Sequence, residues 1–206
     1  MPSIGGRLLA LLLTGPALAA CQVGTPPVDP AQVGLQRGDV PADLARCPNS
    51  GPVDTYMKQL SAKDPEGHAT LQQGWRRLRS AGAVEGVMTV YTAAPGDCLN
   101  EPGAGARRLA ATLVTRFDSD QAAAAAYPKG AMGFPTPGQD QEEPGLQQGV
   151  ATQLSPNSWL LQREVGTQAL EVAYWQRGTC TIYFVSLDLD TVEASRAFTA
   201  VDGRAD

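Results

Sequence analysis

Two acidic segments contain the side chains that are best suited to bind a metal ion. Residues 140–143 read Asp-Gln-Glu-Glu, and Asp188, Asp190 and Glu193 lie close together near the C-terminus. Carboxylate oxygens are the ligands that calcium prefers, but neither segment has the glycine and the ligand spacing of an EF-hand loop. Helix capping accounts for the second segment and solvation of a loop for the first, so we predict no metal site.

The residues that usually carry hydrolytic or phosphoryl-transfer chemistry are few. His68 is the single histidine, and Glu66 is the neighbouring carboxylate that could orient it. No Gly-x-Ser-x-Gly segment marks a nucleophile elbow, and no glycine-rich segment ends in Gly-Lys-Ser or Gly-Lys-Thr. We therefore expect no catalytic residue, no cofactor and no enzyme activity.

The N-terminus has the features of an export leader. Arg7 precedes an apolar run over residues 8–13, which is far shorter than the roughly 20 residues that span a bilayer. Residues 18–21 read Leu-Ala-Ala-Cys, and this segment resembles the lipobox of bacterial lipoproteins. The resemblance implies that residues 1–20 are removed and that Cys21 carries lipid, which would anchor the protein to a membrane of the cell envelope, outside the cytoplasm. The alternative is an ordinary secretory leader with an incidental cysteine.

The charge of the chain excludes two kinds of partner. The chain contains 16 Lys and Arg residues and 21 Asp and Glu residues, which gives a formal net charge of −5. The leader contributes one arginine and no acidic residue to these counts. An acidic domain has no electrostatic attraction to nucleic acid or to anionic lipid head groups. The lipid on Cys21 is therefore the membrane contact that we expect.

A segment rich in proline and glycine follows the leader. We predict an extended tether over residues 21–42, in which large apolar side chains are scarce, and a globular domain over residues 43–206. The tether includes Arg37-Gly38-Asp39, an adhesion tripeptide, but three-residue matches are common by chance and we assign it no function.

Two amphipathic helices are predicted at the start of the domain. Apolar side chains over residues 53–60 recur at the spacing of one helical face. Asp64 and Pro65 are typical of an N-cap and a first helical position, and the helix that they begin should end near Gly82.

Two capping boxes predict two more helices. Asp118 with Gln121 precedes a run of alanines, and Asp190 with Glu193 precedes a last helix over residues 191–201. Alanine has high helix propensity but little apolar area, so the alanine-rich helix should pack close against a sheet.

Five segments have the period of two that is typical of strands. Glycines at positions 166 and 178 separate the last three, which predicts tight antiparallel turns, and residues 128–149 form a long loop. We predict a single α+β domain, an antiparallel sheet of about five strands with helices packed on it. The strands cover residues 83–92, 108–117, 159–165, 168–177 and 180–189.

Three cysteines remain if Cys21 is lipidated. Cys47 and Cys98 lie in irregular segments flanked by proline and glycine, whereas Cys180 lies in a strand with the parity of its apolar neighbours. We predict a Cys47–Cys98 disulfide in an oxidising compartment, and pairing of either with Cys180 is the alternative.

Several of these segments together resemble uncharacterised bacterial lipoproteins. The similar segments are residues 46–65, 113–127 and 170–178, followed by Ser186 to Asp190 and a closing helix. The architecture is also similar, more loosely, to the PsbP-like sandwiches of some exported lipoproteins. This resemblance implies no activity and no functional residue, because likeness of fold is not evidence of function.

One face of the predicted sheet collects large aromatic and charged side chains. Aromatic rings supply contact area and polar groups supply orientation, so this combination is suited to binding a ligand. We expect Trp175 to lie in a partly open groove, while Leu170, Val172 and Tyr174 face the core. The residues assigned to the groove face are Tyr91, Arg116, Gln162, Glu171, Trp175, Arg177 and Tyr183.

We therefore expect a lipid-anchored exported protein with a non-catalytic ligand-binding or sensor domain. The first alternative is a structural or protein-interaction module of the cell envelope, which a convex exposed apolar patch would favour. If a helix covers the polar face, its residues belong to the rim and core and there is no groove. A metal-binding protein and a hydrolase are weaker alternatives.

Overall fold

The computed structural model describes residues 28–99, 108–132, 134–138 and 141–205. The leader over residues 1–20 and the lipidation residue Cys21 lie outside this part of the chain, as does Asp140.

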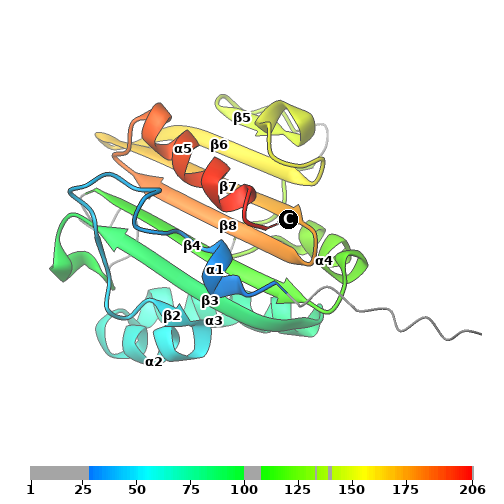
Figure 1. Cartoon of the computed structure of the whole chain (residues 1–206), viewed down its shortest axis with the longest axis horizontal. Coiled ribbons are helices and arrows are strands. Elements are labelled where there is room, and N and C mark those ends of the chain that lie inside the picture. Colours follow the sequence, from blue (N-terminus) through cyan, green and yellow to red (C-terminus); the bar gives the residue numbers. More distant parts are fainter. Residues whose placement is uncertain (1–27, 100–107, 133, 139–140, 206) are drawn as a thin grey trace, which may run out of the picture.

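One antiparallel sheet of eight strands organises the domain (Figure 1). Five long strands match the predicted segments, and three short strands that the sequence analysis did not predict extend the two edges. The order across the sheet is β1-β3-β4-β8-β7-β6-β5, with β2 also paired to β3. The strands are β1 (Ala45–Arg46), β2 (Gly51–Pro52), β3 (Ala83–Thr92), β4 (Leu109–Phe117), β5 (Leu146–Gln148), β6 (Ser158–Val165), β7 (Gln168–Arg177) and β8 (Cys180–Leu187).

Helices α2 (Val53–Lys63), α3 (Pro65–Ser80) and α4 (Asp120–Ala126) cover one face of the sheet, which we call the first face. This face carries Met88, Leu113 and Tyr174. Helix α3 approaches β3 closely because Gly86 has no side chain, and a Cβ there would lie 2.8 Å from the ring of Trp75. Helix α4 also packs closely, as its alanine content predicts, against β4, β7 and β8.

The opposite face, which we call the second face, is covered by helix α5 (Thr191–Asp202) and by the N-terminal segment, residues 28–44. Figure 1 shows both in front of the sheet, α5 in red and the N-terminal segment in blue. Trp175, Phe184 and Phe198 lie in the core that they enclose. The sheet is therefore buried on both faces.

The prediction of an extended tether is wrong for residues 28–42. This stretch contains helix α1 (Pro30–Val33), capped by Asp29, and its apolar side chains Val33 and Leu35 are buried against the second face. The Arg37-Gly38-Asp39 tripeptide is part of this packed segment, and Asp39 is buried in an ion pair with Arg204. A few well-spaced apolar residues are enough to dock a segment rich in proline and glycine when a sheet face needs covering.

The helix boundaries follow local capping chemistry. Asp64 caps α3 through the backbone N–H of Gly67, and Asp190 and Glu193 form the predicted capping box of α5. Helix α4 differs by one residue from its prediction, because Ser119 rather than Asp118 is the N-cap. Short 3₁₀ turns, η1 (Pro95–Asp97), η2 (Tyr127–Lys129) and η3 (Gly149–Thr152), lie between the larger elements.

Within the described residues, none of the helices has the length and apolar character needed to cross a membrane.

Candidate functional site

The predicted groove around Trp175 does not exist. The side chain of Trp175 is 0% exposed, and Tyr91 is also buried in the core of the second face. The charged neighbours of Trp175 that argued for an open site have partners that allow burial. The guanidinium of Arg177 pairs with Asp202 of α5, and the Glu171 carboxylate accepts a 2.5 Å hydrogen bond from Gln162.

Tyr183 lies on the opposite side of the sheet from the other predicted groove residues. It stands across from Tyr174, whereas the partner of Trp175 on β8 is Ile182. The alternation predicted for β7 is correct, since Tyr174 and Trp175 lie on opposite faces of the sheet. Both faces of the sheet are apolar, however, so alternation does not indicate which face is open. Arg116 lies at the end of β4 and pairs with Glu85.

A cavity of about 350 Å³ lies on the first face instead. Its floor is formed by side chains of several neighbouring strands, including Ala111, Val172 and Val185. Tyr56 and Leu60 of α2, with Gly67, Thr70 and Leu71 of α3, form one wall, and Met132 and Phe134 form part of another. The cavity lining is mostly apolar, which is typical of a small-molecule site.

The lengths of the covering elements explain why this space is left. Helices α2 and α3 contact β3, whereas α4 has only seven residues and follows the Phe117 end of β4. The cavity lies over the other half of β4, between Leu109 and Leu113. The small side chain of Ala111 is part of the floor there.

Two tyrosines bring hydroxyl groups to the lining. Burial, together with the charge of Asp64, raises the pKa of Tyr56 to about 12, and burial also raises the pKa of Tyr183. The ring of Tyr183 stacks on Phe134 with centroids 5.8 Å apart. Neither hydroxyl makes a hydrogen bond within the described part of the chain. Both phenols therefore stay neutral at physiological pH and are available to orient a ligand.

Three charged residues also line the cavity. Asp64 caps α3 with its carboxylate 2.9 Å from the Gly67 nitrogen. Asp97 belongs to η1 and has an interaction partner. Arg163 is an exposed residue of β6, and it takes part in no ion pair or side-chain hydrogen bond among the residues that the structure describes.

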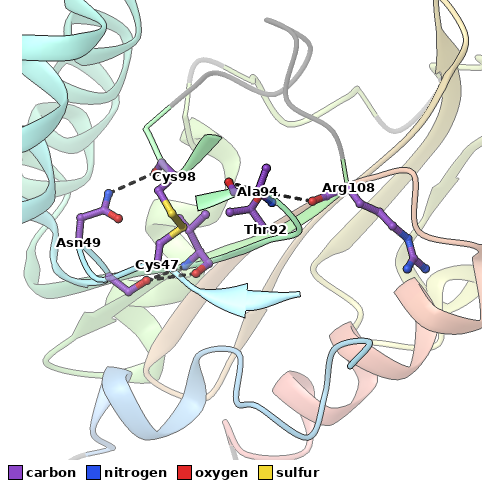
Figure 2. Close-up of a disulfide and its surroundings, with 8 residues drawn as sticks. Cys47, Asn49, Thr92, Ala94, Cys98 and Arg108 are labelled. Atoms are coloured by element: carbon purple, nitrogen blue, oxygen red, sulfur yellow. Dashed lines mark hydrogen bonds between the residues drawn. A yellow bond between two sulfur atoms is a disulfide. The ribbon is translucent and has the colours of Figure 1, made fainter. Parts of the chain in front are cut away.

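The predicted Cys47–Cys98 disulfide is confirmed (Figure 2). It links the segment before α2 to the residue that follows Asp97. Asn49 supports it by donating a side-chain hydrogen bond of 3.3 Å to the carbonyl of Cys98. Cys180 is free and buried as predicted, and burial raises the pKa of its thiol to about 11.

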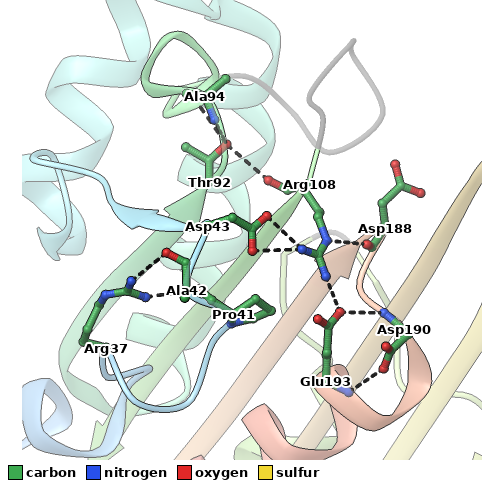
Figure 3. A network of polar contacts seen from close by, with 10 residues as sticks. All are labelled: Arg37, Pro41, Ala42, Asp43, Thr92, Ala94, Arg108, Asp188, Asp190 and Glu193. Carbon is green, nitrogen blue, oxygen red and sulfur yellow. Dashed lines mark hydrogen bonds and ion pairs between the residues drawn. The ribbon is translucent and has the colours of Figure 1, made fainter.

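The acidic segment near the C-terminus has a structural role. Arg108 binds the Asp43 carboxylate at 2.8 and 2.9 Å, pairs with Glu193, and donates to the carbonyl of Asp188 (Figure 3). The hydrogen bond from Arg108 lowers the pKa of Asp43. This network joins the N-terminal segment, β4 and the start of α5.

Across the described residues, no group of three or more His, Cys, Asp or Glu side chains could hold a metal ion. The Asp188 carboxylate accepts hydrogen bonds from the backbone N–H of Ala169 and from the side chain of Gln168, so both of its oxygens have partners within the protein. His68 lies half-buried on α3.

No family model matches this chain, and no curated protein matches its sequence. Of the seven residues predicted to form the groove face, only Tyr183 lines this cavity. The segment over residues 128–149, predicted as a long loop, contributes Met132 and Phe134. Apolar lining residues such as Leu60, Leu71 and Val185 gave no signal of a site in the sequence, because each is an ordinary core residue of its own strand or helix.

Proposed function

We propose that this protein is an exported, lipid-anchored, non-catalytic module that binds a small apolar molecule in the cavity of the first face. The anchor is inferred from the Leu-Ala-Ala-Cys segment that ends at Cys21. The observation that carries the binding function is the cavity of about 350 Å³ whose lining includes residues of α2 and α3 together with Met132 and Phe134.

The size and lining of the cavity support this proposal. Ligand sites are typically about 300–1,000 Å³, apolar for the most part, with a few polar groups that orient the ligand. At about 30 Å³ for each water-sized group, the cavity holds roughly a dozen non-hydrogen atoms. Leu60, Leu71 and Val185 supply apolar contact, and the hydroxyls of Tyr56 and Tyr183 supply orientation.

A protein-interaction role has less support. The large apolar side chains exposed within the described residues are Val150, Val165 and Val192, which belong to three different elements. Large contiguous apolar patches are what mark protein-contact surfaces, and isolated exposed residues are normal.

Thermal melts of the full-length chain test this function with octan-1-ol, an uncharged probe of nine non-hydrogen atoms. Binding to the folded state raises the melting temperature as the probe concentration rises. Ala111→Phe fills the floor of the cavity and should abolish the shift, and Ala111→Leu should reduce it. The matched control is Ala125→Phe, at an exposed position of α4. Equal shifts in the control and in both cavity variants would contradict the proposal.

A further inference from the structure

Arg163 differs from the other arginines near the ends of the long strands. Arg116 pairs with Glu85, and Arg177 pairs with Asp202. Arg163 lines the cavity, and no described carboxylate lies within ion-pair distance of it. An arginine guanidinium keeps its charge at any physiological pH, so Arg163 places an unneutralised cation beside an apolar space.

The two acidic residues of the lining are already engaged. Asp64 accepts the capping hydrogen bond from Gly67, and it stands at the N-terminus of α3, a helix of 16 residues whose dipole offsets its negative charge. Asp97 also takes part in an interaction within the protein, so this residue is not free. Arg163 is thus the lining charge that is left for a ligand.

Apolar lining continues from the cavity out to Arg163. Val165, two residues along β6, lines the cavity and is 42% exposed, which makes it one of the large apolar residues that the fold leaves in contact with solvent. Leu170, the residue across from Arg163 on β7, also lines the cavity. The exposed end of the site therefore combines a cation with apolar side chains, whereas the floor is apolar and carries no charge.

We propose that the ligand is a monoanionic amphiphile, whose apolar chain occupies the cavity and whose anionic head pairs with Arg163. This inference rests on the proposed function, and it adds the chemical class of the ligand. Octanoate is a suitable probe because its ten non-hydrogen atoms match the size of the cavity. A partly exposed ion pair contributes up to about 1 kcal/mol, which corresponds to a factor of about five in the dissociation constant.

The test compares octanoate, octan-1-ol and octylammonium on the full-length chain at pH 7.5 by isothermal titration calorimetry. The Arg163→Gln variant should bind octanoate about fivefold more weakly than the unmodified chain does. Its affinity for octan-1-ol should be unchanged. Arg163→Glu should shift the preference to octylammonium. The matched control is Arg76→Gln, an exposed arginine of α3 that does not line the cavity. The octanoate preference should also weaken as salt is raised.

The outcomes separate the two proposals. If octan-1-ol binds but Arg163→Gln leaves the octanoate preference unchanged, the cavity function stands and the role of Arg163 is overturned. Tighter binding of octylammonium than of octanoate to the unmodified chain would likewise overturn it, because Asp64 and Asp97 would then determine the head group. If none of the three compounds binds, the proposed function and this inference both fail.

Discussion

Arg177 of β7 and Asp202 of α5 form a two-point ion pair, in which the Arg177 Nε lies 3.0 Å from one carboxylate oxygen and an Nη pairs with the other. The same guanidinium donates to the carbonyl of Leu154. The pair joins the end of the last helix to the strand that carries Trp175. Helix α5 can therefore cover the second face although charged side chains lie at its margin.

Trp175 is expected to be essential for stability. Its side chain is fully buried, so Trp175→Ala should lower the free energy of unfolding by about 3–5 kcal/mol, measured by urea denaturation. Val150→Ala, at a position that is 84% exposed, is the control and should change stability by less than about 0.5 kcal/mol. A loss of under about 1 kcal/mol for Trp175→Ala would contradict the burial of this face.

Reduction of the disulfide should destabilise the fold. Cys47 and Cys98 are separated by 51 residues, for which loss of the cross-link costs about 4 kcal/mol in the chain-entropy model. The replacement Cys47→Ala with Cys98→Ala should therefore lower the melting temperature, and the unmodified chain under reducing agent should lose a similar amount.

Alkylation provides an independent check on the cysteines. Cys180 is free but buried, so it should react with iodoacetamide only after denaturation. Mass spectrometry that finds Cys180 linked to Cys47 or Cys98 would contradict the pairing.

Glu171 should make stability depend on pH. Desolvation raises the pKa of its carboxyl above the ordinary 4.5, opposed by the hydrogen bond from Gln162. The folded state then binds a proton more tightly than the unfolded state, so stability falls as pH rises from about 4.5 through the raised pKa. Glu171→Gln should be more stable than the unmodified chain at pH 7, with a smaller difference at pH 4. Glu164→Gln, at an exposed position, is the control. Equal pH profiles for Glu171→Gln and the unmodified chain would argue against this role.

The anchor is tested at Cys21. If the Leu-Ala-Ala-Cys segment is a lipobox, Cys21→Ser gives a protein without lipid, which partitions into the aqueous phase of a detergent extraction instead of the detergent phase. Equal partitioning of the variant and the unmodified chain into detergent would contradict the lipid anchor.

Local chemistry predicted the long elements of this fold. The spacing of apolar residues over residues 53–60, the cap at Asp64 and the capping box of Asp190 with Glu193 were sufficient to locate α2, α3 and α5. The five long strands followed from alternation in the same way. The short strands β1, β2 and β5 were missed because segments of two or three residues have no period to detect.

The placement of the site depended on contacts that sequence spacing does not contain. Alternation separated Trp175 from Tyr174, but both residues are fully buried, since a helix and the N-terminal segment cover one face and α2, α3 and α4 cover the other. Tyr183 was the residue in the predicted groove that belongs to the cavity. Tyr183 lies on the first face because it pairs with Tyr174, and that pairing is set by the register between β7 and β8.

The sequence by itself thus located the helices and the long strands and favoured the cysteines that pair, because each depends on neighbouring residues or on a local environment. The tertiary structure decided which sheet face is filled and where space remains. The cavity exists because α4 covers only one end of β4 while α2 and α3 lie over β3, and this difference in coverage arises only when segments far apart in the chain are packed together.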